Sequence, residues 1–277
     1  MSQTAAGVGP LLSQWRRLRG KSQLDLAVLA AVSARHVSFV ETGRSQPSRD
    51  MVLTLATALQ VPLRERNALL LAAGYAPLYR ETRLDAPELG PARRAFDMIL
   101  KHQEPYPAVV LDGEWNLLRM NDAASTFFSR LVEAKPDGPP NVLRLMFDER
   151  YLKPYVENWE EVAADLVQRA HREATGGIPN EALRRVLKEI LAYPGVPERF
   201  GSLDPSVPLA PFVPISFKKG DLALRYFSLV TTLGAPQDVT LQELRVESFF
   251  PADAETERAA ARLFADSRGK VSDPGPG

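Results

Sequence analysis

Residues 22–43, with the sequence SQLDLAVLAAVSARHVSFVETG, contain the pattern that decides the fold of the first part of this chain. Ser22 and Ser33 each stand before apolar residues at helical spacing, where a short hydroxyl side chain caps the first turn of a helix. Ala27 is small enough to let two helices cross closely. The stretch therefore predicts two short helices joined by a tight turn, the helix-turn-helix arrangement.

The second helix of this pair is predicted to have one buried face and one free face. Val37 and Val40 are expected to anchor it on the core, and Gly43 ends it. Its N-terminal, outward face is then free. In helix-turn-helix domains that face enters the major groove of DNA.

Further short helices are expected on both sides of the pair. Apolar residues recur at helical spacing before it, and Ser48 and Pro62 are suited to open two helices after it. The expected segments are 11–18, 48–59 and 62–73. With the central pair they predict a compact all-α domain of five helices.

The rest of the chain mixes strand and helix patterns. Runs typical of strands occur at 107–112, 115–120, 213–217, 222–233 and 241–249. Helical patterns occupy 92–102, 123–132, 142–147, 159–175, 180–192 and 254–265. Two strands, then several helices, then three strands favour an α+β domain with one antiparallel sheet and the helices on one face. A cavity between sheet and helices is a common place for a small ligand.

Composition supports a division into two domains. Residues 1–84 carry 11 Lys and Arg against 5 Asp and Glu, whereas the remainder carries 23 against 29. A basic first part suits the binding of phosphates, and the acidic remainder is not expected to add DNA affinity. We predict a DNA-binding domain at 1–84, a proline-rich linker at 85–91, a second domain at 92–266 and a disordered tail at 267–277.

Several classes of function are disfavoured by what the chain lacks. With no cysteine, disulfides, thiolate nucleophiles and cysteine-bound metals are excluded. The histidines do not show HxH or HExxH spacing, and GxSxG and glycine-rich phosphate loops do not occur. Adjacent acids such as Asp148-Glu149 are interpreted as solvated helix faces. We expect no catalysis, no metal and no cofactor, although composition does not exclude a Ser–Lys self-cleaving domain.

The chain also lacks signals for a membrane or for export. No run approaches the ~18 apolar residues that a membrane span needs, and the first ten residues do not form a secretory signal. We expect a cytoplasmic protein that does not contact a membrane.

Residues 11–74 resemble the Cro/cI-type, or XRE-type, helix-turn-helix domain of bacterial and phage repressors. The matching positions, spread over the whole domain, are Arg16, Ser22-Gln23, Leu26-Ala27, Ser33, Glu41, Gly43, Pro47 and Leu55-Ala56. The resemblance implies that Arg16 and Glu41 form a partly buried ion pair. It also implies that the domain binds double-stranded DNA.

The resemblance assigns roles on the DNA to individual positions. Gln23 contacts phosphate, Ala34, Arg35 and Phe39 face base edges, and Thr42 and Arg44 contact the backbone. The full set of expected DNA-binding residues is Gln23, Ser33, Ala34, Arg35, His36, Ser38, Phe39, Thr42 and Arg44.

Two of these residues are expected to determine which bases of the DNA are recognised. Arg35 has the geometry for a bidentate bond to guanine. Phe39 departs from the polar residue usual at its position, so it is expected either to touch a thymine methyl or to help bury a domain contact.

The second part of the chain resembles the C-terminal ligand-binding domain of MmyB-like regulators, which has a PAS-like fold. The resemblance lies in PAVVLDGEWNLLRMNDAA (107–124), in residues 141–174 and in FKKGDLALRYFSLVTTLG (217–234). Its motifs include Asp112 to Trp115, Asn121 and the Asn141–Arg144 segment. Relatives often carry a histidine before the third strand, and this chain has none at 211–214, so no role attached to that histidine is carried over.

This second resemblance implies a small hydrophobic effector, with a fatty acid as the most plausible class. Arg144, Arg169 or Arg225 are candidates to anchor a carboxylate, although each also suits a structural ion pair. The expected ligand-binding residues are Trp115, Met120, Phe127, Phe128, Arg144, Met146, Trp159, Leu166, Arg169 and Tyr226. The aromatic and apolar members serve equally well as core, and the sequence does not divide them.

The sequence therefore predicts a transcription regulator controlled by a small apolar ligand. A homodimer is expected, because a single small DNA-binding domain contacts too few base pairs for selective binding. Such domains generally bind two-fold operators whose half-sites lie about one helical turn apart. Two alternatives stay open: a second domain that binds a protein partner, and an enzyme with a DNA-targeting head.

Overall fold

The computed structural model describes residues 7–175, 180–201 and 213–271. The chain forms two compact units, one built mainly from residues up to Arg83 and the other from Leu84 onwards. The segment Ala235–Gln242 belongs to the first unit.

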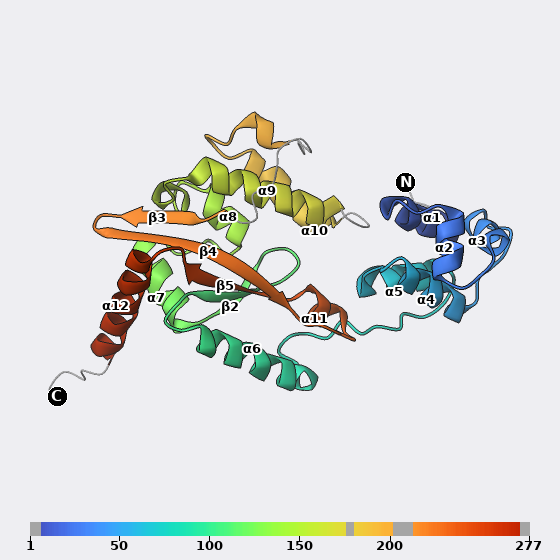
Figure 1. Cartoon of the computed structure of the whole chain (residues 1–277), viewed down its shortest axis with the longest axis horizontal. Helices are drawn as coiled ribbons and strands as arrows, with labels where there is room; N and C mark the ends of the chain where they lie inside the picture. Colours follow the sequence, from blue (N-terminus) through green and yellow to red (C-terminus); the bar gives the residue numbers. More distant parts are fainter. Residues whose placement is uncertain (1–6, 176–179, 202–212, 272–277) are drawn as a thin grey trace. The chain divides into compact units, whose positions relative to one another are not determined.

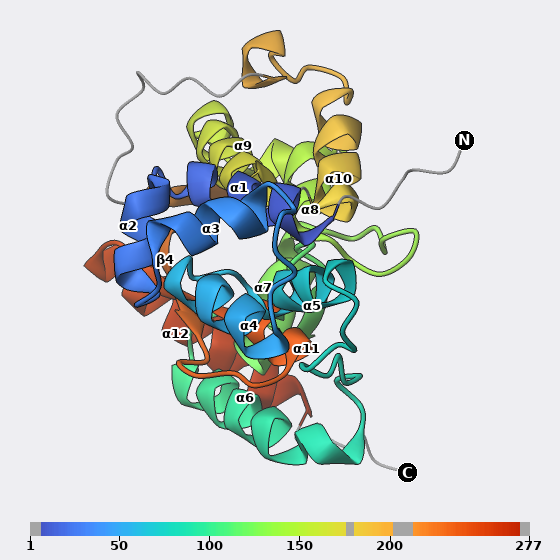
Figure 2. The ribbon, with the colours of Figure 1, turned by 90° about the vertical axis from the view of Figure 1, so that its right-hand side faces the viewer.

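The first unit is a bundle of short helices, seen most clearly in Figure 2. These helices are α1 (Val8–Leu18), α2 (Gln23–Leu29), α3 (Ala34–Glu41), α4 (Arg49–Ala58) and α5 (Leu63–Ala72). The hydroxyl groups of Ser22, Ser33 and Ser48 accept hydrogen bonds from backbone N–H groups in the first turns of α2, α3 and α4. The expected all-α domain and its three serine caps are confirmed.

Helices α1, α2 and α3 pack closely against one another. This packing is seen in the angle between α2 and α3 and in the position at which α1 starts. The pair is bent by 116° at its break, within the range of the helix-turn-helix motif. Helix α1 begins at Val8, three residues before its predicted start. The absence of a side chain at Gly9 allows this early start of α1. Any other residue there would place its Cβ atom 2.5 Å from the carbonyl oxygen of Glu41 in α3, which is too close. Trp15, fully buried, fills the centre of the bundle.

The second unit contains a five-stranded antiparallel sheet with helices inserted between its strands (Figure 1). Its strands are β1 (Ala108–Leu111), β2 (Leu117–Met120), β3 (Ile215–Lys219), β4 (Leu222–Thr232) and β5 (Arg245–Pro251). Its α-helices are α6 (Gly90–Gln103), α7 (Asp122–Leu131), α8 (Val142–Phe147), α9 (Trp159–Thr175), α10 (Glu181–Leu191) and α12 (Ala254–Val271). Short 3-10 turns occur at Pro87–Leu89, Lys153–Tyr155 and Glu198–Gly201, and α11 (Val239–Glu243) lies between β4 and β5.

The strand order is β2-β1-β5-β4-β3, and the predicted α+β, PAS-like class is confirmed. Val109 and Leu111 face the main core together with residues of α7 to α10. Ala108 and Val110 alternate with them and are also fully buried, so both faces of β1 are covered. Figures 1 and 2 show α6 on the side of the sheet opposite α9 and α10. One helix thus departs from the predicted single helical face.

Several boundaries in the second unit differ from the sequence-based prediction. Trp115 was placed in a strand, but it has φ +68°, and the strand starts at Leu117. The cause is Asp112, whose Oδ1 accepts hydrogen bonds from the backbone N–H groups of Glu114 and Asn116 and tightens the turn.

The predicted strand 241–249 was also misplaced at its start. Residues 239–243 are helical, because Asp238 Oδ1 accepts from the backbone N–H groups of Thr240 and Leu241, and β5 begins only at Arg245. Helix α12 continues to Val271, through residues expected to be a disordered tail, and 272–277 lie outside the described residues. The segment 85–91, expected to be a linker, contains a 3-10 turn and the start of α6.

Candidate functional site

The outward face of α3 carries an arginine and a phenylalanine one helical turn apart. The guanidinium carbon of Arg35 lies 5.1 Å from the ring centroid of Phe39, which is the geometry of a cation–π contact. Arg35 is exposed and Phe39 is half-buried. The phenyl ring therefore supports the guanidinium, which accounts for an apolar residue at a position where a polar one was expected.

The other expected DNA-contacting residues lie around the same helix. Ser33 caps α3 by accepting from the N–H of His36, and the Thr42 hydroxyl donates to the carbonyl oxygen of Ser38. Exposed or half-buried positions are held by Ala34, His36, Ser38 and Arg44. The two hydroxyl groups of Ser33 and Thr42 shape the helix ends, and DNA contact by any of these residues remains a prediction.

A partly buried ionic network ties α1, α2 and α3 together. Arg16 Nε and Nη2 donate to the two carboxylate oxygens of Glu41 at 2.6 and 2.8 Å. Gln23 Nε2 donates to Glu41 Oε2 at 2.8 Å, so the expected phosphate contact already has one partner within the domain. The ion pair implied by the resemblance is present, and it fixes the first residue of α2 against α3.

The ion pair shifts the titration of Glu41. Burial by itself raises the pKa of this carboxyl, but the hydrogen bonds from Arg16 and Gln23 outweigh it and leave the pKa below its ordinary value. The Glu41 side chain is 5% exposed, so this is an interaction of the domain interior.

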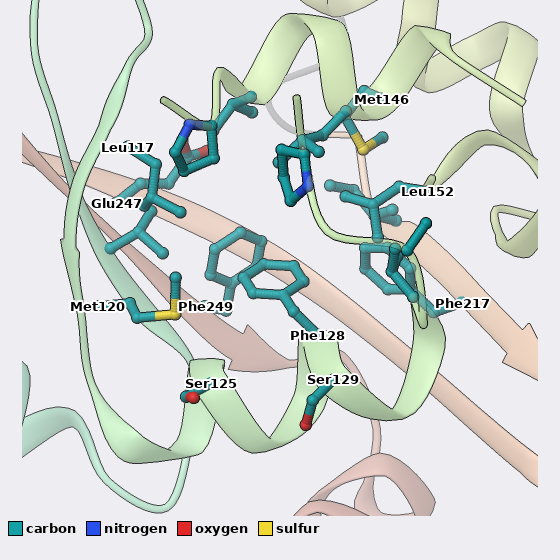
Figure 3. A pocket seen from close by; sticks show the side chains of 18 of the residues that line it. Leu117, Met120, Ser125, Phe128, Ser129, Met146, Leu152, Phe217, Glu247 and Phe249 are labelled. Atoms are coloured by element: carbon teal, nitrogen blue, oxygen red, sulfur yellow. The ribbon is translucent and has the colours of Figure 1, made fainter. Parts of the chain in front are cut away.

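A cavity of about 540 Å³ lies in the second unit between the sheet and its helices (Figure 3). This is within the usual size range of small-molecule sites. Its lining is largely apolar and consists of Val109, Leu117, Met120, Ser125, Phe128, Ser129, Val132, Glu133, Ala134, Lys135, Pro136, Pro140, Val142, Leu145, Met146, Leu152, Leu166, Ile215, Phe217, Glu247 and Phe249.

The charged residues of the lining lie at different depths. Glu133 and Lys135 belong to the exposed segment that follows α7, and Glu133 pairs with Lys219. Glu247, on β5, is only 7% exposed. The cavity thus has a charged, solvated rim and one buried carboxylate.

Two family models match the chain over most of its length. A helix-turn-helix domain model matches residues 8–69, and the MmyB-like transcription regulator ligand binding domain model matches residues 92–263. The chain belongs to the MmyB-like transcription regulators. It is a DNA-binding transcription regulator with a ligand-binding domain, and the cavity lies within the matched ligand-binding region.

Comparisons with curated proteins and with solved structures add no further function to this MmyB-like regulator. A search of curated proteins found no match. A solved structure described as an RNA-binding light-oxygen-voltage receptor is 11% identical, and the alignment covers 94% of this chain and 65% of that one with a TM-score of 0.25.

Four of the expected ligand-binding residues line the cavity of this MmyB-like regulator. They are Met120, Phe128, Met146 and Leu166. Two expected residues are core instead. Phe127 and Tyr226 are 1% exposed and meet edge to face at 5.7 Å. Trp159 is also outside the lining, because its indole N–H donates to the carbonyl oxygen of Met146.

The arginines proposed as carboxylate anchors do not line the cavity. Arg144 forms a two-point ion pair with Glu189, at 2.9 and 2.8 Å. The Arg225 side chain is exposed on β4. Arg169 pairs with Glu173 and lies over the ring of Trp115, 4.6 Å from its centroid.

Trp115 belongs to that same polar cluster rather than to the cavity. Arg245 lies 4.3 Å from the Trp115 centroid, and the indole N–H donates to Glu173. The structural ion-pair interpretation therefore holds for Arg144 and Arg169.

Most residues that line the cavity of this MmyB-like regulator, Glu247 among them, are outside the set expected from the sequence. The sequence does contain a pattern that indicates the position of Glu247. Arg245 and Glu247 alternate with Val246 and Ser248 at the start of a strand that ends in apolar residues. That alternation places charged residues on a single face. Which face is the inner one depends on pairing with β1, where Val109 lies opposite Glu247.

The described part of the chain offers neither a metal cluster nor a long apolar helix. No group of three or more His, Asp and Glu residues there is placed to hold a metal ion. No single described helix has the length and hydropathy to cross a membrane, although the bent α2–α3 pair would pass by length and composition alone.

Replacing Glu41 with glutamine is expected to flatten the acid side of the stability curve of the first unit. The folded pKa of Glu41 is depressed, so its carboxylate stabilises the fold above the ordinary value of 4.5 and loses this effect as pH falls through the folded pKa. Between about pH 5 and about pH 3, urea unfolding should show a steeper loss of free energy in wild type than in E41Q. Equal slopes would contradict the assignment.

Proposed function

We propose that this regulator reads a two-fold operator through α3 and is controlled by a small apolar molecule in the cavity of its second unit. The observation that carries the proposal is the cavity, with its buried apolar walls and a volume of about 540 Å³ in a ligand-binding domain. A change in DNA binding follows only if the ligand favours one conformational state over another.

We propose an acyl chain as the apolar part of this ligand, in keeping with the fatty-acid class expected from the family resemblance. Phe128, Met146 and Phe249 provide flexible or flat apolar surface suited to methylene groups. Lys135 on the rim is the basic residue of the described lining. A carboxylate head, if the ligand has one, therefore belongs at the rim and not with Arg144, Arg169 or Arg225.

Retained lipid is the direct test of the proposal. Native mass spectrometry and solvent extraction of the purified full chain are expected to show a bound acyl compound, or micromolar binding of added ones. An empty cavity together with a salt-stable complex with another protein would instead favour a second domain that binds a protein partner.

Leu117→Trp is expected to weaken binding of any acyl ligand by at least about tenfold, because the indole takes up space inside the cavity. Leu117 lines the cavity on β2, and Figure 3 shows its side chain beside that of Glu247. The matched control is Leu118→Trp, since Leu118 is the next residue, is 40% exposed and is outside the lining. Calorimetric titration that gives equal losses for both variants would remove the cavity as the binding site.

We also propose that the regulator is a cytoplasmic, XRE-type homodimer. Operator selection from random DNA, with and without extracted cell lipids, tests operator symmetry and ligand control together. Selected sites with two inverted half-sites are expected, with half-site centres about 10 base pairs apart or a multiple of that. Single, asymmetric sites bound by a monomer would contradict this part of the proposal.

A further inference from the structure

One end of the cavity is formed by a buried carboxylate. Figure 3 shows Glu247 beside Leu117 and Met120, whereas Met146, Leu152 and Phe217 lie at the other end. Glu247 is 7% exposed, and the β1 residue opposite it is apolar. A carboxylate buried among apolar walls is costly unless it is hydrogen-bonded or paired.

Two described residues, Ser228 and Arg169, contact this carboxylate. The Ser228 hydroxyl donates to Glu247 Oε1 at 2.7 Å, and Arg169 Nη1 lies 3.7 Å from the same oxygen. A carboxylate offers about four acceptor positions. These two contacts with described residues both fall on Oε1, so acceptor capacity remains for a donor brought by a ligand.

The carboxylates at this end of the cavity disfavour an anion placed directly beside Glu247. Arg169 is shared, because its Nε also lies 3.3 Å from Glu173 Oε1. A second carboxyl, Asp165, is close by: burial raises its pKa, Arg169 and Arg172 lower it, and the charge of Glu247 raises it further. A ligand carboxylate placed here would meet like charge, whereas a hydroxyl or an ammonium group would gain a charge-assisted hydrogen bond.

Building on the proposed function, we propose that the cavity selects apolar chains with a hydrogen-bond donor, a hydroxyl or an ammonium group, at the end that reaches Glu247. The carboxylate of Glu247 is the specificity-determining group. The apolar walls bind the chain, and the donor decides which chains are accepted. The chain of an unsubstituted fatty acid packs against the apolar walls, but this ligand brings no hydrogen-bond donor to Glu247.

Matched ten-carbon probes test this selection in the full-length protein. Decylamine, 1-decanol, decanoic acid and methyl nonyl ether are titrated by calorimetry, the amine and the acid below their micelle concentrations and the alcohol and the ether below their solubility limits. Decylamine and 1-decanol are expected to bind about tenfold more tightly than the ether, which has a similar length and no donor, and than the acid.

Variants separate the role of the charge from the role of the acceptor. Glu247→Gln keeps size and an acceptor oxygen, so it should lose the preference for the amine and retain most of that for the alcohol. Glu181→Gln removes an exposed carboxylate on α10, outside the lining, and is expected to leave all preferences unchanged. Thermal unfolding of each variant checks that the second unit stays folded.

The outcomes distinguish this inference from the proposed function. If no apolar probe binds wild type, the proposed ligand site fails and this inference fails with it. If all four probes bind with similar affinity, if the acid binds most tightly, or if E247Q keeps the wild-type order, the inference is overturned while the apolar ligand site stands. Loss of the amine preference in E247Q, but not in E181Q, supports it.

Discussion

Arg16→Met is expected to destabilise the first unit by about 3 kcal/mol, the largest loss of stability among the substitutions considered for it. The Arg16 and Glu41 side chains are 13% and 5% exposed, and the pair joins residues 25 positions apart. Removing the guanidinium leaves a buried carboxylate with the Gln23 amide still bound to it. The cost lies at the low end of the range for broken buried ion pairs because neutral donors, the Gln23 amide among them, still reach the carboxylate.

Hydrogen exchange of the amides in α1 to α5 measures this change within the full chain, since it reports local unfolding free energies. The double variant Arg16→Met, Glu41→Leu should recover most of the loss, because an apolar pair carries no uncompensated charge. Arg64→Met is the surface control. Arg64 and Glu81 are 45% and 57% exposed, and such pairs contribute about 0–1 kcal/mol. Equal effects of R16M and R64M would contradict the role given to the network.

Arg35→Ala is expected to lower discrimination at one base pair of the operator by about 5- to 150-fold. This corresponds to the ~1–3 kcal/mol of a bidentate contact with guanine. The guanidinium is presented from the N-terminal half of α3 and is held over the Phe39 ring. Phe39→Ala should therefore reduce discrimination at the same base pair by a smaller factor, because it frees the arginine without removing it.

Binding to the selected operator and to its single-base variants measures both effects. Arg44→Ala is the informative contrast, since loss of a phosphate contact should weaken binding to all sequences alike. It should also reduce the number of counterions released on binding by about one. If R35A keeps wild-type affinity and selectivity, α3 does not read the operator through this residue. If F39A leaves discrimination unchanged, the ring does not position the guanidinium.

The sequence by itself determined the first unit because its signals are local. Ser22, Ser33 and Ser48 cap helices within three residues of their own positions, and helical periodicity identifies the buried face. It also determined the order of strands and helices in the second unit. It failed at Trp115 and at 241–243, where an aspartate side chain bonded to nearby backbone replaced the expected extended conformation.

Only the tertiary structure decided which apolar residues line the cavity and which form the core. Phe127 and Phe128 are adjacent in the sequence, yet Phe127 packs against Phe217 and Tyr226 in the core while Phe128 faces the cavity. Arg144 has its partner 45 residues away, at Glu189. Glu247 lies on the cavity side because β5 pairs with β1 in a register that no local pattern specifies. The chemistry of the ligand site is set by contacts between distant segments, and these form only when the sheet closes over its helices.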